Sequence, residues 1–149
     1  MNTYREEIGN KLNVLLEKNY EAEKGFKKAA EHTDNKFLKG YFERKSKEKY
    51  VFGHELKTEI ISYGQDVEKK DSITAKAHRT WIDVKVLFSS DSEEAILEET
   101  VRGEKFAIKE YAEVLEELTL PPSTAVILKK QKSAIELGLT NMKTLEDLA

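Results

Sequence analysis

Apolar residues recur at intervals of three and four over four long segments of this chain, and that spacing predicts helices throughout. The predicted helices cover residues 4–31, 35–63, 92–118 and a last segment from residue 122 or 123 to 145. A strand would alternate apolar and polar residues, and no such run occurs. The only prolines, Pro121 and Pro122, stand together and separate the last two helices.

The connections between these segments predict how the helices pack. The first and third connections are short and predict two antiparallel hairpins, whereas the second is long. We expect a shorter helix over residues 73–88 within it, with Trp81 and Phe88 docked on the bundle. Asp34 is the expected N-cap of the second helix, and Gly64 its expected stop.

One long crossover between the second and third helices is typical of ferritin-like bundles. The 149 residues correspond to a single domain. The sequence therefore predicts an all-α fold, a ferritin-like four-helix bundle over residues 1–149, with an extra short helix in the crossover.

Composition and charge exclude several classes of function. The net charge is -3, and the 25 basic residues are interleaved with 28 acidic ones, so nucleic acid is not an expected partner. No apolar run approaches the ~18 residues of a membrane span. The first residues lack the apolar region of a signal peptide, and there is no Cys. We expect a cytoplasmic protein without disulfides or thiolate metal sites.

Glu104 interrupts the apolar face of the third long helix. That face is otherwise apolar: Leu97, Val101, Ile108, Tyr111 and Leu115. A buried carboxylate is costly unless it is paired, hydrogen-bonded or bound to a metal. Glu104 is therefore the residue of this chain that most needs a partner.

Other polar residues lie on or beside the apolar faces near the midpoints of the helices. They are Asn19, Glu23, Lys45, Glu48, Lys49 and Gln131. Because they should lie at similar depth in a bundle, we expect a buried polar layer. Each long helix also has a glycine near its middle, which indicates either close helix packing or room for a bulky neighbour at the bundle centre: Gly25, Gly53, Gly103 and Gly138.

A metal site is one reading of this layer. Di-iron and di-manganese bundles use a Glu on each of two helices and Glu-x-x-His on the other two. The candidate ligands here are Glu23, Glu55 and Glu104, but no Glu-x-x-His occurs. The three histidines are expected outside the core: His32, His54 and His78.

An internal salt-bridge network is the other reading. Lys45 or Lys49 would pair with Glu23 or Glu104, and the side-chain amides of Asn19 and Gln131 would satisfy the remaining lone pairs. Such a network stabilises little in net terms but can fix helix register. Catalytic motifs are lacking, since neither a G-x-S-x-G elbow nor a Gly-rich phosphate loop occurs.

Several strings together resemble a known family. They are LEKNYEAEKGFKKAAE, HRTWIDVK, SDSEEAILEETVRGEKFAIKEYAEVLEE and LPPS, the most specific parts being H-R-x-W and E-A-I-L-E-E-x-x-R-G-E. Over nearly its whole length the chain is similar to a bacterial ferritin-like four-helix-bundle family of unknown function. The resemblance implies that fold, a bacterial cytoplasmic protein and no established activity.

The resemblance also implies a set of acidic positions, namely Glu55, Glu98, Glu99 and Glu104. Where that family has a His eight residues after the glutamine of the last helix, this chain has Leu139. Membership of a fold does not transfer function.

The first functional hypothesis is therefore a non-catalytic bundle with a degenerate metal site and no cofactor. It would act as a stress-associated or interaction module and as a homodimer through an exposed helix face. The alternative is an iron- or manganese-binding protein with oxidase-like activity and ligands Glu23, Glu55 and Glu104. A third hypothesis is a helical scaffold that binds a partner peptide.

Overall fold

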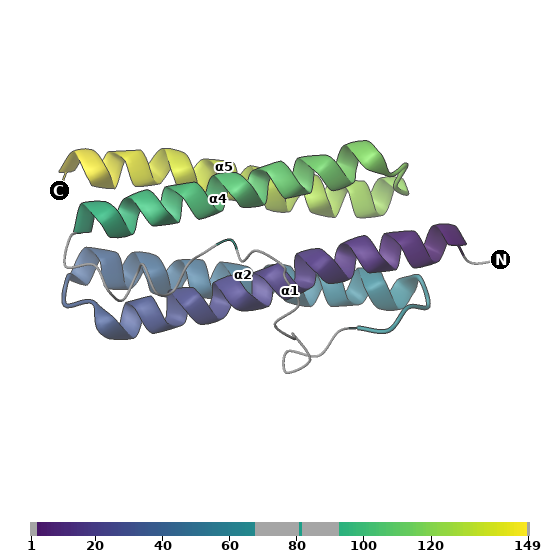
Figure 1. The fold of residues 1–149 in the computed structure, drawn as a ribbon, viewed down its shortest axis with the longest axis horizontal. Coiled ribbons are helices and arrows are strands. Elements are labelled where there is room, and N and C mark those ends of the chain that lie inside the picture. Colours follow the sequence, from purple (N-terminus) through teal and green to yellow (C-terminus); the bar gives the residue numbers. More distant parts are fainter. Residues whose placement is uncertain (1–2, 68–80, 82–92, 149) are drawn as a thin grey trace.

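Four long α-helices make up the computed structural model, which describes residues 3–67, 81 and 93–148. They are α1 (Thr3–His32), α2 (Lys36–Ser62), α4 (Glu93–Glu117) and α5 (Pro122–Leu148) (Figure 1). The described residues contain no strand, so the all-α prediction is confirmed. The short helix expected over residues 73–88 lies outside the described residues, apart from Trp81. None of the described helices is long and apolar enough to cross a membrane.

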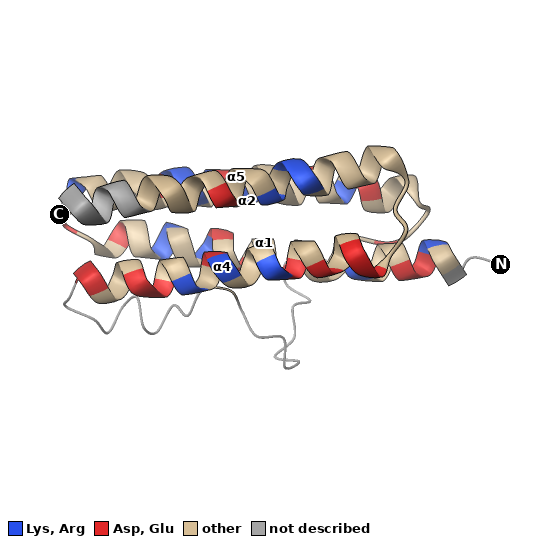
Figure 2. Ribbon diagram, turned by 90° about the horizontal axis from the view of Figure 1, so that it is seen from above, with Lys and Arg blue, Asp and Glu red and all other residues tan. Residues whose placement is uncertain are grey.

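The helices form two antiparallel hairpins that pack on each other. In Figure 1, α1 and α2 make the lower hairpin and α4 and α5 the upper one, and α2 and α4 run in the same direction. Figure 2 places α1 and α4 on one side of the molecule and α2 and α5 on the other. Because α2 and α4 lie diagonally opposite each other, side chains that join them must cross the centre of the bundle.

Local signals set the ends of α2. Its N-cap is Asn35, not Asp34 as predicted, because the Asn35 side chain accepts hydrogen bonds from the backbone N–H groups of Phe37 (2.9 Å) and Leu38 (3.1 Å). These bonds satisfy donors that the first turn of a helix leaves free. The predicted stop at Gly64 is confirmed, since its φ of +71° lies in the left-handed region that favours glycine.

The core follows most of the predicted apolar faces. On α2 the buried residues include Leu38, Phe42, Lys45, Lys49, Phe52, Leu56 and Ile60. Several positions differ from prediction. On α4, Val101, Ile108 and Leu115 are half-buried, whereas the preceding residues Thr100, Ala107 and Val114 are buried. On α1, Ala22 is buried and Glu23 is only half-buried, and on α5, Leu128 is buried whereas Ile127 is half-buried.

Candidate functional site

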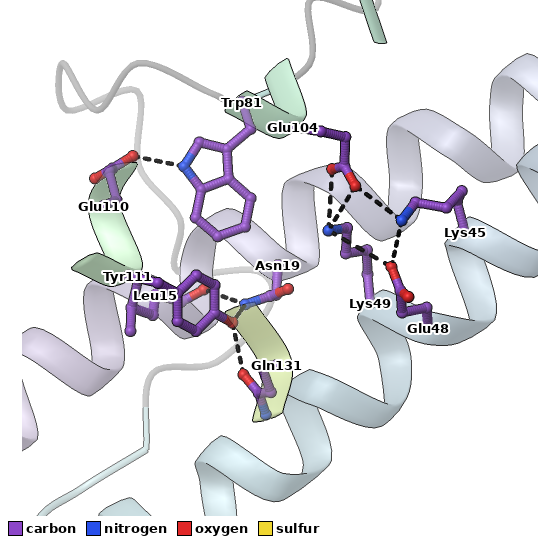
Figure 3. A network of polar contacts seen from close by, with 10 residues as sticks. All are labelled: Leu15, Asn19, Lys45, Glu48, Lys49, Trp81, Glu104, Glu110, Tyr111 and Gln131. Carbon is purple, nitrogen blue, oxygen red and sulfur yellow. Dashed lines mark hydrogen bonds and ion pairs between the residues drawn. The ribbon is translucent and has the colours of Figure 1, made fainter. Parts of the chain in front are cut away.

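Glu104 lies at the centre of the bundle between two lysine side chains. Its side chain on α4 is 1% exposed. The Lys45 Nζ lies 2.8 Å from Glu104 Oε2, and the Lys49 Nζ lies 3.0 Å from Oε1 (Figure 3). Both lysines come from α2 and are separated by one helical turn, so they point to the same place. The carboxylate therefore joins α4 to α2 across the bundle.

Glu48 completes this cluster. Its Oε2 lies 2.5 Å from the Lys45 Nζ and 3.9 Å from the Lys49 Nζ. The Glu48 side chain is 24% exposed, so it connects the buried charges to the edge of the bundle. We call Lys45, Glu48, Lys49 and Glu104 the ionic cluster. With all four groups ionised, two positive charges balance two negative charges.

The surroundings of the two lysines explain how they fit in the core. Lys49 is fully buried, and its Nζ lies 5.6 Å from the centre of the Phe52 ring and 5.7 Å from that of Trp81. Such distances are typical of cation–π contacts. A Cβ atom at Gly138 of α5 would lie 3.1 Å from the Lys45 Nζ. The mid-helix glycine of α5 therefore leaves room for a bulky neighbour, the Lys45 side chain.

The ionic cluster changes the acid–base properties of its members. Burial alone would raise the pKa of Glu104, but the Lys49 and Lys45 ammonium groups outweigh it and lower that pKa. Burial lowers the pKa of Lys49, and Glu104 opposes it. Burial would also lower the pKa of Lys45, but Glu104 and Glu48 together raise it. The carboxylate is thus held in its ionised form by the cations around it.

A second group of polar residues lies beside the ionic cluster and joins all four helices. The Tyr111 hydroxyl of α4 donates to Gln131 Oε1 of α5 (2.6 Å) and accepts from Asn19 Nδ2 of α1 (3.1 Å). Gln131 Nε2 in turn donates to Glu55 Oε1 of α2 (3.0 Å). Asn19 and Gln131 therefore bond to Tyr111, and not to the carboxylate that pairs with the lysines, as was expected of them. Burial raises the pKa of Tyr111, so this hydroxyl stays protonated.

The three residues named as possible metal ligands have different surroundings. Glu104 belongs to the ionic cluster, and half-buried Glu55 accepts from Gln131. Glu23 is half-buried and lines a surface groove between α1 and α2. Within the described parts of the chain, no group of three or more His, Cys, Asp or Glu residues could hold a metal ion. His32 and His54 are exposed, and His78 lies outside the described residues.

Some polar residues near the site are not apparent from the sequence pattern. Glu110 on α4 pairs with the nearly buried Lys18 of α1 and accepts from the Trp81 indole N–H (2.5 Å). Tyr41 has a buried hydroxyl without a hydrogen-bond partner among the described residues. Burial and the charge of Glu104 raise the pKa of Tyr41. Only the spacing of Glu110 from Ala107 and Val114, which are three and four residues away and buried, could have suggested its role.

The comparison with protein families identifies the chain. Residues 7–117 match the family described as Domain of unknown function (DUF2383). This match covers most of the chain, which therefore belongs to that family. No curated protein matches the chain. The matched range contains the whole ionic cluster and Tyr111 and ends with α4, whereas Gln131 and Gly138 lie beyond it.

Proposed function

We propose that this protein is a ferritin-like bundle in which lysine ammonium groups stand where metal-binding bundles hold their cations. It acts as a non-catalytic scaffold that associates with a second copy of itself. The observation that carries the proposal is the position of Glu104, whose two oxygens face Lys49 at 3.0 Å and Lys45 at 2.8 Å.

The direction of the helices supports the ferritin-like assignment. A single long connection joins α2 to α4, and these helices run in the same direction (Figure 1). Bundles with one long crossover include the ferritin-like folds, whose metal sites use inward carboxylates on facing helices. Glu104 is such an inward carboxylate, and its closest charged groups are cations of the chain itself.

The balance of charge supports a site without metal. The ionic cluster is neutral when its four groups are ionised, so a divalent cation would add two positive charges to a buried place. Metal binding would then require the lysines to lose protons or leave the core. Both are costly, because a buried charge without a partner is strongly unfavourable. The Tyr111 and Gln131 side chains are already engaged with each other.

Exposed apolar side chains support association through one side of the bundle. Apart from Tyr4 of α1, the large hydrophobic side chains that the structure describes as exposed lie on α2 and α5: Phe37, Tyr50, Val51, Ile61, Val126 and Leu137. These helices lie on the same side of the molecule (Figure 2). Tyr50 also lines the groove between α1 and α2 and is not counted on this side, whereas association through α2 and α5 would cover the other five. We propose that this α2–α5 side forms the homodimer interface.

Metal content after loading tests the proposal. The protein would be incubated anaerobically with Fe(II), or separately with Mn(II), desalted, and examined by elemental mass spectrometry. We expect no retained metal above the level of Glu104→Gln, a variant that lacks the carboxylate charge. Near-stoichiometric iron or manganese in the unaltered protein, absent from Glu104→Gln, would contradict the proposal and support the oxidase-like alternative.

Sedimentation of Ile61→Lys and Leu137→Lys tests the association separately. We expect both variants to be monomers at concentrations where the unaltered protein is a dimer. Lys105 is exposed on α4, so Lys105→Glu serves as the control. Unaltered association in both α2–α5 variants would exclude this interface.

A further inference from the structure

Trp81 belongs to none of the four helices, yet its side chain lies inside the bundle. It is the only Trp of the chain and the one residue that the structure describes between residue 67 and α4. Its side chain is fully buried. Figure 3 shows the indole beside Tyr111 and the ionic cluster, with its N–H directed at Glu110. The chain thus inserts a flat heteroaromatic ring among side chains from three helices.

The edge of the ring meets an ordered hydrogen-bond acceptor. The indole Nε1–H donates to Glu110 Oε1 at 2.5 Å. The other oxygen of Glu110 pairs with the Lys18 Nζ from α1, and the Lys18 side chain is only 9% exposed. The Lys18 cation therefore holds the Glu110 carboxylate through a contact that does not involve the ring. Hydrogen bonds to charged acceptors are stronger than those between neutral groups.

The faces of the ring meet groups that favour an electron-rich aromatic. The Lys49 Nζ lies 5.7 Å from the indole centre, within cation–π range. The Tyr111 ring lies at a centroid distance of 6.0 Å and is tilted by 39°. The Trp81 backbone carbonyl accepts from Arg102 Nη2 at 3.1 Å. Arg102 is itself held by Glu99.

These contacts are those by which a protein recognises a small ligand. An apolar cavity supplies the contact area, and a few ordered polar groups supply the orientation. We infer that the bundle carries a recognition site for an indole group, formed by Lys18, Lys49, Glu110 and Tyr111 and occupied by the chain's own Trp81. When the Trp81 side chain is removed, the site takes indole from solution.

The N–H group gives the site its selectivity. A site that is built to hydrogen-bond one group of a ligand rejects an analogue without that group. Benzofuran has nearly the same shape as indole, but its ring oxygen would face the Glu110 carboxylate and cannot donate. We expect indole to bind at least about tenfold more tightly than benzofuran.

Thermal unfolding of Trp81→Ala, followed by circular dichroism at rising concentrations of indole or benzofuran, tests the inference. We expect indole to raise the unfolding midpoint saturably, because a ligand that binds only the folded state stabilises it. Benzofuran at equal concentration should give a much smaller shift. The unaltered protein, whose site is filled, is the control and should show no indole-specific shift.

If Trp81→Ala is unfolded without ligand, the same titration measures the recovery of helical signal. Recovery with indole but not with benzofuran supports the site. No stabilisation or recovery by indole, or equal effects of the two compounds, would overturn the inference and leave Trp81 as ordinary apolar packing. Metal loading of the unaltered protein does not affect this result, so the inference and the proposed function can fail independently.

Discussion

Replacement of Glu104 by glutamine removes one charge from the ionic cluster with almost no change in shape. In the folded protein, Lys45 keeps Glu48 at 2.5 Å, but Lys49 is left with Glu48 at 3.9 Å as its closest described carboxylate. Lys49 is fully buried and cannot turn to solvent without leaving the core. The variant therefore contains a buried ammonium group without an adequate counterion.

The free energy of unfolding that Glu104→Gln loses can be estimated in two ways. Removing one partner of a buried ion pair costs about 3–5 kcal/mol. The alternative is that Lys49 loses its proton, which at pH 7 costs about 4.6 kcal/mol, since its unfolded pKa is about 10.4 and each unit is about 1.36 kcal/mol. A loss of 3–5 kcal/mol lowers Tm by roughly 6–20 °C at about 2–4 °C per kcal/mol for a chain of this size.

Urea unfolding of Glu104→Gln measures this loss, with Glu99→Gln as the matched control on the same helix. The Glu99 side chain is only 9% exposed, but its partner Arg102 is 47% exposed and can turn to solvent, so that variant should lose clearly less stability than Glu104→Gln. Adding Lys49→Met to Glu104→Gln removes the uncompensated charge and should restore more than half of the loss. A loss of stability in Glu104→Gln no larger than that in Glu99→Gln, or no recovery with Lys49→Met, would show that Glu104 does not compensate a buried charge on Lys49.

Three further predictions follow from the same contacts. Because the pKa of Glu104 is lowered in the folded protein, its contribution is present above the unfolded pKa of about 4.3 and is lost as pH falls through the lower folded pKa. In urea titrations, the stability gap between the unaltered protein and Glu104→Gln should narrow below about pH 4, and a constant gap would contradict this. Tyr111→Phe should cost about 1–3 kcal/mol, because it leaves the buried Gln131 Oε1 without its donor and removes one of the two acceptors of Asn19 Nδ2. Tyr50→Phe at an exposed position should be near neutral, and equal losses of stability in the two variants would exclude the hydrogen-bonded role of Tyr111. In chemical unfolding, Gly138→Ala should increase the free energy of unfolding by about 1 kcal/mol less than Gly40→Ala does. The new Cβ at position 138 would press on the buried Lys45 Nζ, whereas the one at position 40 would meet only the side chain of exposed Arg44. Equal free energies of unfolding gained by the two glycine variants would contradict this crowding and show that the Lys45 side chain has room to move.

The sequence predicts the helices and most of the buried positions, because an amphipathic helix repeats its buried positions every three or four residues. Lys45, Lys49 and Glu104 were recognised because each stands where an apolar residue is expected. The errors at Glu23, at Ile127 and along α4 have one cause. After Asn19 both Ala22 and Glu23 fit the spacing, and before Gln131 both Ile127 and Leu128 do. Only the packing of neighbouring helices decides between such adjacent positions.

The partners of the polar residues could not be predicted in the same way. A periodic pattern shows which side of a helix is buried, but not which helix lies opposite it. Glu104 reaches α2 across the bundle, and Tyr111 joins Asn19 to Gln131, because α2 and α4 are diagonal. The contact of Trp81 with Glu110 joins residues 29 positions apart in the sequence. Such contacts between distant segments leave no periodic signal.

The ionic cluster requires Lys49 to carry a positive charge inside the bundle, and this charge can be observed. Heteronuclear NMR of protein labelled with ¹⁵N-lysine observes buried ammonium groups, whose protons exchange slowly with water. We expect two protected NH₃⁺ signals at neutral pH, from Lys45 and Lys49, with the Lys49 signal lost or shifted in Glu104→Gln. A neutral Lys49 amine in the unaltered protein, or signals that Glu104→Gln leaves unchanged, would contradict this expectation.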